Sequence, residues 1–162
     1  VEKKVSARRT ALNVPPAREG VHMSSVTVVK RTDPIYPDDQ DVENPLRFES
    51  KKIVPNLAEP IIKAPGNQVW LYMVVYPVPD ALDKPRLVVQ FLRDGQVVAQ
   101  ASPDLPAPDA KGRIGYVGAL PLENFEPGDY EVRAVVRQGG TGEEEHAFFT
   151  VSPEVSGSLT NR

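Results

Sequence analysis

Gly128-Asp129-Tyr130-Glu131-Val132-Arg133-Ala134-Val135-Val136-Arg137 is the stretch that decides the fold of this chain. A glycine-containing turn leads directly into a segment in which apolar and charged side chains alternate. In an extended strand, Tyr130 and the small apolar residues at every second position share one face, and three charged residues mark the other face as solvent-exposed. The pattern predicts a strand with one buried face.

The turn Pro127-Gly128-Asp129-Tyr130 places a tyrosine at the start of this strand. In immunoglobulin-like sandwiches a tyrosine at such a corner donates its hydroxyl to backbone a few residues upstream. We expect the Tyr130 hydroxyl to bond near Phe125, which gives Tyr130 and Gly128 a structural role.

Further strands are predicted on both sides of this stretch. Asp94-Gly95 separates two apolar runs, 86–93 and 96–101, and this dipeptide is a strong signal for a two-residue hairpin turn. The remaining strands are expected at 23–31, 46–49, 51–54, 68–76, 113–120 and 145–151, with an irregular connection at 55–66. The 17 prolines disfavour long helices. The sequence predicts an all-β fold, an immunoglobulin- or fibronectin III-like antiparallel β-sandwich with extra N-terminal strands.

The strands are expected to form a single domain. We place it at 10–152, with N-terminal strands and loops at 10–66 and the core sandwich strands at 67–152. The segments 1–9 and 153–162 are expected to be loose.

Composition narrows the functional classes. The net charge of −3 gives no basic footprint for nucleic acid. The absence of cysteine excludes disulfides and thiol catalysis. The longest apolar run, 69–75, is too short to span a bilayer. Because the chain starts with Val1, we expect a removed leader or a domain cut from a longer protein.

Residues for catalysis are sparse. His22 and His146 lie far apart in the sequence, and no nucleophile elbow, zinc-binding helix motif or phosphate loop is present. A lone histidine on a sandwich strand is far more often a surface residue than a general base. The sequence predicts a protein that is not an enzyme and needs no cofactor.

An acidic loop is the one candidate for a metal site. Asp33, Asp38, Asp39 and Asp41 offer hard oxygen ligands for calcium, but their spacing does not match an EF-hand loop. A solvated loop is the favoured interpretation.

A row of aromatic residues is the candidate ligand-binding feature. Trp70, Tyr72 and Tyr76 share one face of the predicted strand 68–76. If open, this face would present a platform for sugar rings. If covered by the N-terminal third of the chain, it is a second core, and this is the favoured alternative because buried aromatics outnumber exposed platforms.

Several blocks of sequence together resemble a known family. They are Asn44-Pro45-Leu46-Arg47-Phe48, Val74-Val75-Tyr76-Pro77, the run from Lys84 to Gly95, Pro121-Leu122, Pro127 to Val132, and Phe149-Thr150-Val151. In this order they are similar to the carboxy-terminal β-sandwich region of secreted von Willebrand factor A-related proteins of acidobacterial type. The resemblance implies a secreted, periplasmic or cell-surface protein in which this module follows a larger domain. The metal-adhesion motif of that domain does not occur in this chain.

These observations lead to an expected function. We expect a non-catalytic accessory module of an exported bacterial protein, which acts as a spacer and binds a protein partner or other domains of its parent chain. One alternative is a carbohydrate-binding module that uses Trp70 and Tyr72 on a polysaccharide. A further alternative is the accessory domain of a secreted hydrolase.

Overall fold

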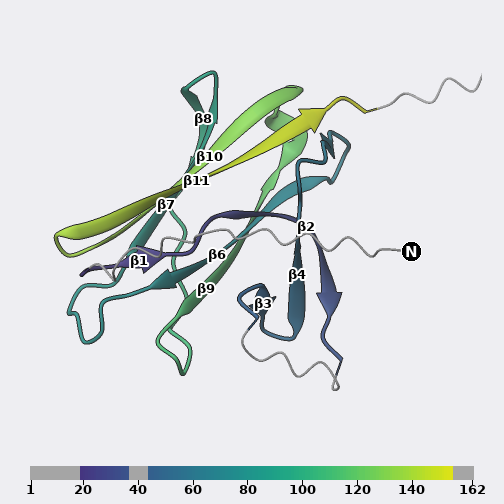
Figure 1. The fold of residues 1–162 in the computed structure, drawn as a ribbon. Coiled ribbons are helices and arrows are strands. Elements are labelled where there is room, and N and C mark those ends of the chain that lie inside the picture. Colours follow the sequence, from purple (N-terminus) through teal and green to yellow (C-terminus); the bar gives the residue numbers. More distant parts are fainter. Residues whose placement is uncertain (1–18, 37–43, 155–162) are drawn as a thin grey trace, which may run out of the picture.

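The structure is a computed structural model that describes residues 19–36 and 44–154. These residues form two β-sheets packed face to face (Figure 1). The elements in chain order are β1 (His22–Met23), β2 (Thr27–Pro34), β3 (Arg47–Phe48), β4 (Lys51–Pro55), β5 (Ile61–Ile62), β6 (Gln68–Tyr76), β7 (Arg86–Arg93), β8 (Gln96–Ala101), β9 (Ile114–Pro121), the short 3₁₀ helix η1 (Leu122–Asn124), β10 (Gly128–Gln138) and β11 (Thr141–Ser152).

The first sheet is centred on β6. The strand β9 pairs with one edge of β6 along nearly its whole length, from Gln68–Pro121 to Val75–Ile114. The other edge of β6 pairs with β1 at its end and with β2 further along, and β4 and β3 continue the sheet beyond β2. All pairings in this sheet are antiparallel.

The second sheet has the order β5-β11-β10-β7-β8. Its centre is the long β10–β11 hairpin, whose two strands lie side by side in Figure 1. The predicted alternation of β10 is confirmed: Val132, Ala134 and Val136 are fully buried. The alternate positions, which include Glu131, Arg133 and Arg137, lie on the outer face. The pairing of β5 with the last two residues of β11 is parallel, and every other strand pairing among the described residues is antiparallel.

This arrangement confirms the predicted sandwich. The neighbours β6 and β9 occupy the positions of strands B and E of an immunoglobulin fold, and β7, β10 and β11 occupy those of C, F and G. The strands β2, β4 and β3 extend the first sheet as the expected N-terminal additions. The Asp94-Gly95 hairpin is also confirmed, with positive φ at both residues (51° and 75°), as a type I′ turn requires.

One contiguous core fills the space between the sheets. Its aromatic end contains Phe91, Phe125, Tyr130 and Phe149, where the Tyr130 ring stacks on Phe149 with the centroids 5.4 Å apart. The Tyr130 hydroxyl donates a hydrogen bond of 2.7 Å to the carbonyl of Glu126, so the tyrosine corner is present. Gly128 before it has a φ of 146°, which favours glycine at this position.

Candidate binding surface

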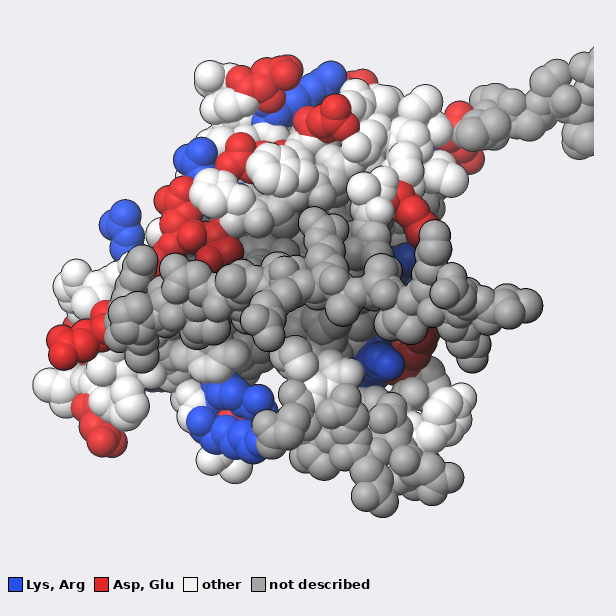
Figure 2. All heavy atoms as spheres, in the orientation of Figure 1, with Lys and Arg blue, Asp and Glu red and all other residues white. Residues whose placement is uncertain are grey.

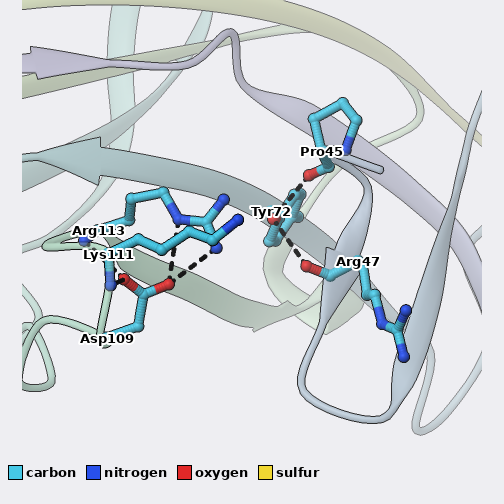
Figure 3. A network of polar contacts seen from close by, with 6 residues as sticks. All are labelled: Pro45, Arg47, Tyr72, Asp109, Lys111 and Arg113. Carbon is cyan, nitrogen blue, oxygen red and sulfur yellow. Dashed lines mark hydrogen bonds and ion pairs between the residues drawn. The ribbon is translucent and has the colours of Figure 1, made fainter. Parts of the chain in front are cut away.

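The three aromatic residues of β6 have different environments. Tyr72 is buried, with 4% of its surface exposed, beneath the segment that carries β3. Its hydroxyl donates to the carbonyl of Pro45 at 2.9 Å (Figure 3). Phe48 packs edge-on against its ring. Burial, with a smaller contribution from Tyr76, raises the pKa of Tyr72, although Arg113 opposes this shift. Tyr72 is therefore part of a second, small core and offers no face to a ligand.

Trp70 and Tyr76 remain on the surface, 45% and 40% exposed. They lie six positions apart along the strand, a distance of roughly 20 Å. Because the covered Tyr72 lies between them, the row does not form a continuous flat platform. The cover expected from the N-terminal third is thus present over Tyr72 and Val74, while Trp70 is partly open to solvent.

The acidic candidates for calcium are only partly within the described residues. Asp33 lies in β2, where its carboxylate accepts two hydrogen bonds from the Arg31 guanidinium. Asp38, Asp39 and Asp41 lie outside the described residues. Within 19–36 and 44–154 no group of three histidine or acidic side chains is placed to hold a metal ion.

The two histidines lie on different strands and are not brought together as a catalytic pair. His22 in β1 faces Glu143 at 3.7 Å. His146 in β11 lies between two carboxylates, with Nδ1 2.7 Å from Glu131 and Nε2 3.0 Å from Glu144. Both ring nitrogens therefore face carboxylates rather than a hydroxyl group that could act as a nucleophile. This geometry favours a surface charge cluster over a general base.

Acidic side chains are spread over the face seen in Figure 2. Three consecutive glutamates lie in β11. They include Glu143, whose carboxylate accepts a hydrogen bond of 2.5 Å from the backbone N–H of Met23 in β1. Glu143 therefore helps to hold the N-terminal strand, and Glu144 belongs to the cluster around His146.

A large hollow lies at one end of the sandwich. It has a volume of 1070 Å³ between the β6–β7 loop (77–85) and the β8–β9 loop (102–113), which lie at the same end of the molecule in Figure 1. We call it the loop groove. Six prolines line it: Pro77, Pro79, Pro85, Pro103, Pro106 and Pro108. Proline fixes φ and reduces the number of conformations that a loop can adopt, so both walls are stiff.

Gln138 holds the first wall in place. This side chain at the end of β10 is only 6% exposed. Its Oε1 accepts from the backbone N–H of Val78 at 2.8 Å, and its Nε2 donates to the carbonyl of Asp83 at 2.7 Å. One buried amide thus joins the two arms of the β6–β7 loop and satisfies two backbone groups there.

Asp109 orders the second wall. Its Oδ1 accepts from the backbone N–H groups of Lys111 and Arg113, and its Oδ2 accepts from the Arg113 guanidinium at 2.9 and 3.0 Å (Figure 3). The hydrogen bond from the Arg113 backbone is the main reason that the pKa of Asp109 is lowered. Gly112, with a φ of 76°, completes this tight turn before β9.

The groove combines apolar and charged groups. Leu87 and Ile114 of the core lie at its base, and carboxylates and cations are at its rim: Asp80, Asp83, Asp104, Lys84 and Arg86. Leu82, at the tip of the β6–β7 loop, is fully exposed. Sequence patterns did not identify this groove, since each of its two loops looks like an ordinary connection. The clustered prolines were the available signal.

Comparison of the sequence with models of known protein families found no match, and a search of curated proteins found none either. Among the described residues there is no helix with the length and apolar character needed to cross a membrane.

Proposed function

We propose that this chain is a non-catalytic protein-binding module, and that a segment of its partner binds in the loop groove. The observation that carries this proposal is the pair of stiff, anchored loops around the loop groove. Binding sites lie preferentially on loops positioned by a rigid scaffold. Loops that are already ordered lose less conformational entropy when a partner binds.

The groove also has the chemical character of a recognition site. It offers apolar surface from prolines and core residues, and its charged rim can fix the orientation of a bound segment. The exposed Leu82 beside it is available as an apolar contact. We further propose that the module belongs to an exported bacterial protein related to von Willebrand factor A proteins, where it would bind a partner or a neighbouring domain. Sequencing of the surrounding reading frame tests this setting.

A selection from random peptides tests the binding site. Peptides that bind the wild-type protein are selected, and their affinity is measured for two variants. Ala107→Trp places a large side chain in the groove, and Ala119→Trp places the same side chain beside Trp70 on the other sheet. Both alanines are exposed, so the two substitutions are matched in size and in exposure to solvent.

The proposal expects selected peptides to lose binding to Ala107→Trp and to keep it with Ala119→Trp. Loss of binding to Ala119→Trp with unchanged binding to Ala107→Trp would show that the peptides bind at the Trp70 face instead. That face is the site of the alternative carbohydrate-binding function, which the burial of Tyr72 disfavours.

A further inference from the structure

Two arginines lie directly opposite each other on neighbouring strands. Arg86 of β7 pairs in register with Arg137 of β10. The next pair, Leu87 and Val136, is buried in the core, so both arginines are on the outer face of the second sheet, where they are exposed. Like charges directly opposite on a sheet are destabilising. The two opposed arginines therefore do not contribute to the stability of the fold.

No described carboxylate neutralises this pair. Arg31, Arg93, Arg113 and Arg133 each have an acidic partner within 4.0 Å. Arg86 and Arg137 have no such partner among the residues that the structure describes. Lys84 lies beside them in a shared hollow of 530 Å³. Asp83 also lines this hollow, but it makes no ion pair with any residue that the structure describes.

Apolar surface borders the two arginines. The adjacent cross-strand pair is Val88 and Val135, and both valines line a second hollow of 460 Å³ together with Arg86 and Arg137. Beyond the valines, Arg133 forms ion pairs with Glu131 and Glu144. The surface with unpaired positive charge therefore does not extend past Val88 and Val135. We call Lys84, Arg86, Arg137, Val88 and Val135 the arginine strip.

The strip is continuous with the loop groove. Asp83, Lys84, Arg86 and Gln138 line both the groove and the hollow that contains the arginine pair. A segment bound in the groove can therefore extend along the outer face of β7 and β10. This is a local concentration of positive charge in a chain whose net charge is −3.

We infer that the arginine strip binds the carboxylate side chains of an acidic partner segment that also carries apolar residues. This inference rests on the proposed function and names the chemistry of the partner. Charge complementarity requires an anionic ligand, and the guanidinium group matches the geometry of a carboxylate with two parallel hydrogen bonds. The two valines beside the arginines favour a peptide with apolar side chains over a uniformly polar anionic polymer.

The test uses a fluorescently labelled peptide that alternates glutamate and leucine, and a second peptide with glutamine in place of glutamate. Affinities are measured by anisotropy for the wild type and for the double variant Arg86→Gln/Arg137→Gln. The control is Lys51→Gln/Lys52→Gln, which removes the same charge from exposed positions on β4 of the other sheet. Unfolding curves show that each variant is folded, and loss of the arginine pair is expected to leave stability unchanged or slightly raised.

The inference predicts that the glutamate peptide binds the arginine double variant about tenfold or more weakly than the wild type, as expected when charge-assisted hydrogen bonds are lost. The lysine control should bind like the wild type, and the glutamine peptide should bind weakly to all proteins. Added salt should reduce the difference.

Three results would overturn the inference. Equal losses in the arginine variant and the lysine control would show a net-charge effect alone. The glutamate peptide could also lose binding to Ala107→Trp and bind the arginine variant as well as the wild type. This result would show that the peptide binds in the loop groove and that the arginine strip does not contribute. Tighter binding of polygalacturonate than of the glutamate peptide, dependent on both arginines, would assign the strip to an acidic polysaccharide.

Discussion

Substitution of Tyr130 by phenylalanine removes one hydrogen bond and leaves the ring in place. The hydroxyl that would be lost donates to the carbonyl of Glu126 at 2.7 Å, and Tyr130 is only 3% exposed. The ring contacts with Phe125 and Phe149, at centroid distances of 5.0 and 5.4 Å, are available to phenylalanine as well. The variant therefore isolates the contribution of the corner hydrogen bond.

The expected loss follows from that geometry. A typical intramolecular hydrogen bond contributes about 0.5–1.5 kcal/mol net to stability. For a domain of this size, each kcal/mol corresponds to a decrease of about 2–4 °C in Tm. Removal of the ring itself by Tyr130→Ala should cost about 3–5 kcal/mol, because a cavity would open among the aromatic residues.

Urea unfolding followed by circular dichroism measures these differences. The free energy of unfolding should fall for Tyr130→Phe while the denaturant slope stays constant, as expected when only stability changes. The matched control is Tyr116→Phe, a half-buried tyrosine whose hydroxyl has no described hydrogen-bond partner. Equal stabilities of the wild type and Tyr130→Phe, or equal losses in the two variants, would refute the structural role of this corner.

Four further predictions concern the candidate site and its surroundings. Gln138→Leu should lower stability by about 1–3 kcal/mol, since it leaves two backbone groups of the β6–β7 loop without their buried partner, and thermal unfolding measures the loss. Burial raises the pKa of Tyr72 above its usual value of 10.0, so its contribution is present below about pH 10 and is lost as the pH rises. The stability difference between the wild type and Tyr72→Phe should therefore shrink above that pH in unfolding curves. The lowered pKa of Asp109 has the opposite consequence: the difference between the wild type and Asp109→Asn should be present above about pH 4 and vanish as the pH falls below it. Trp70 is the single tryptophan and is 45% exposed, so iodide should quench its fluorescence in the folded protein, and complete protection would contradict its placement.

Local sequence signals predicted the strands that carry the sandwich. The alternation after Gly128 and the Asp94-Gly95 turn each specify one geometry, and both are present in the structure. In these segments the turn residues and the spacing of the apolar residues favour the same arrangement. The sequence pattern is therefore sufficient to predict the strand and its buried face.

Strands that depend on distant partners were harder to predict. The segment 55–66 was expected to be irregular, but Ile61 and Ile62 form β5 because β11 lies beside them. The predicted strand 23–31 is divided into β1 and β2. Its break is at Ser24, whose side chain accepts a hydrogen bond from the backbone of Val74. Such short elements are stabilised by tertiary pairing rather than by their own propensity.

The candidate site also depends on contacts between distant segments, which local sequence patterns do not predict. Trp70 and Tyr72 have equivalent positions in the strand pattern, but a segment 27 residues earlier in the chain covers only Tyr72. The loop groove depends on Gln138, which from sequence looks like the first residue of a hairpin turn. Its buried position becomes visible only once the β6–β7 loop is placed against the end of β10.

NMR chemical-shift mapping with a peptide selected on the wild-type protein tests the proposed binding role most directly. The largest shifts are predicted in the β6–β7 and β8–β9 loops and should continue along Arg86 and Arg137. Shifts confined to the surface around Trp70, or a selection that enriches no peptide, would contradict the assignment of the loop groove as the binding site.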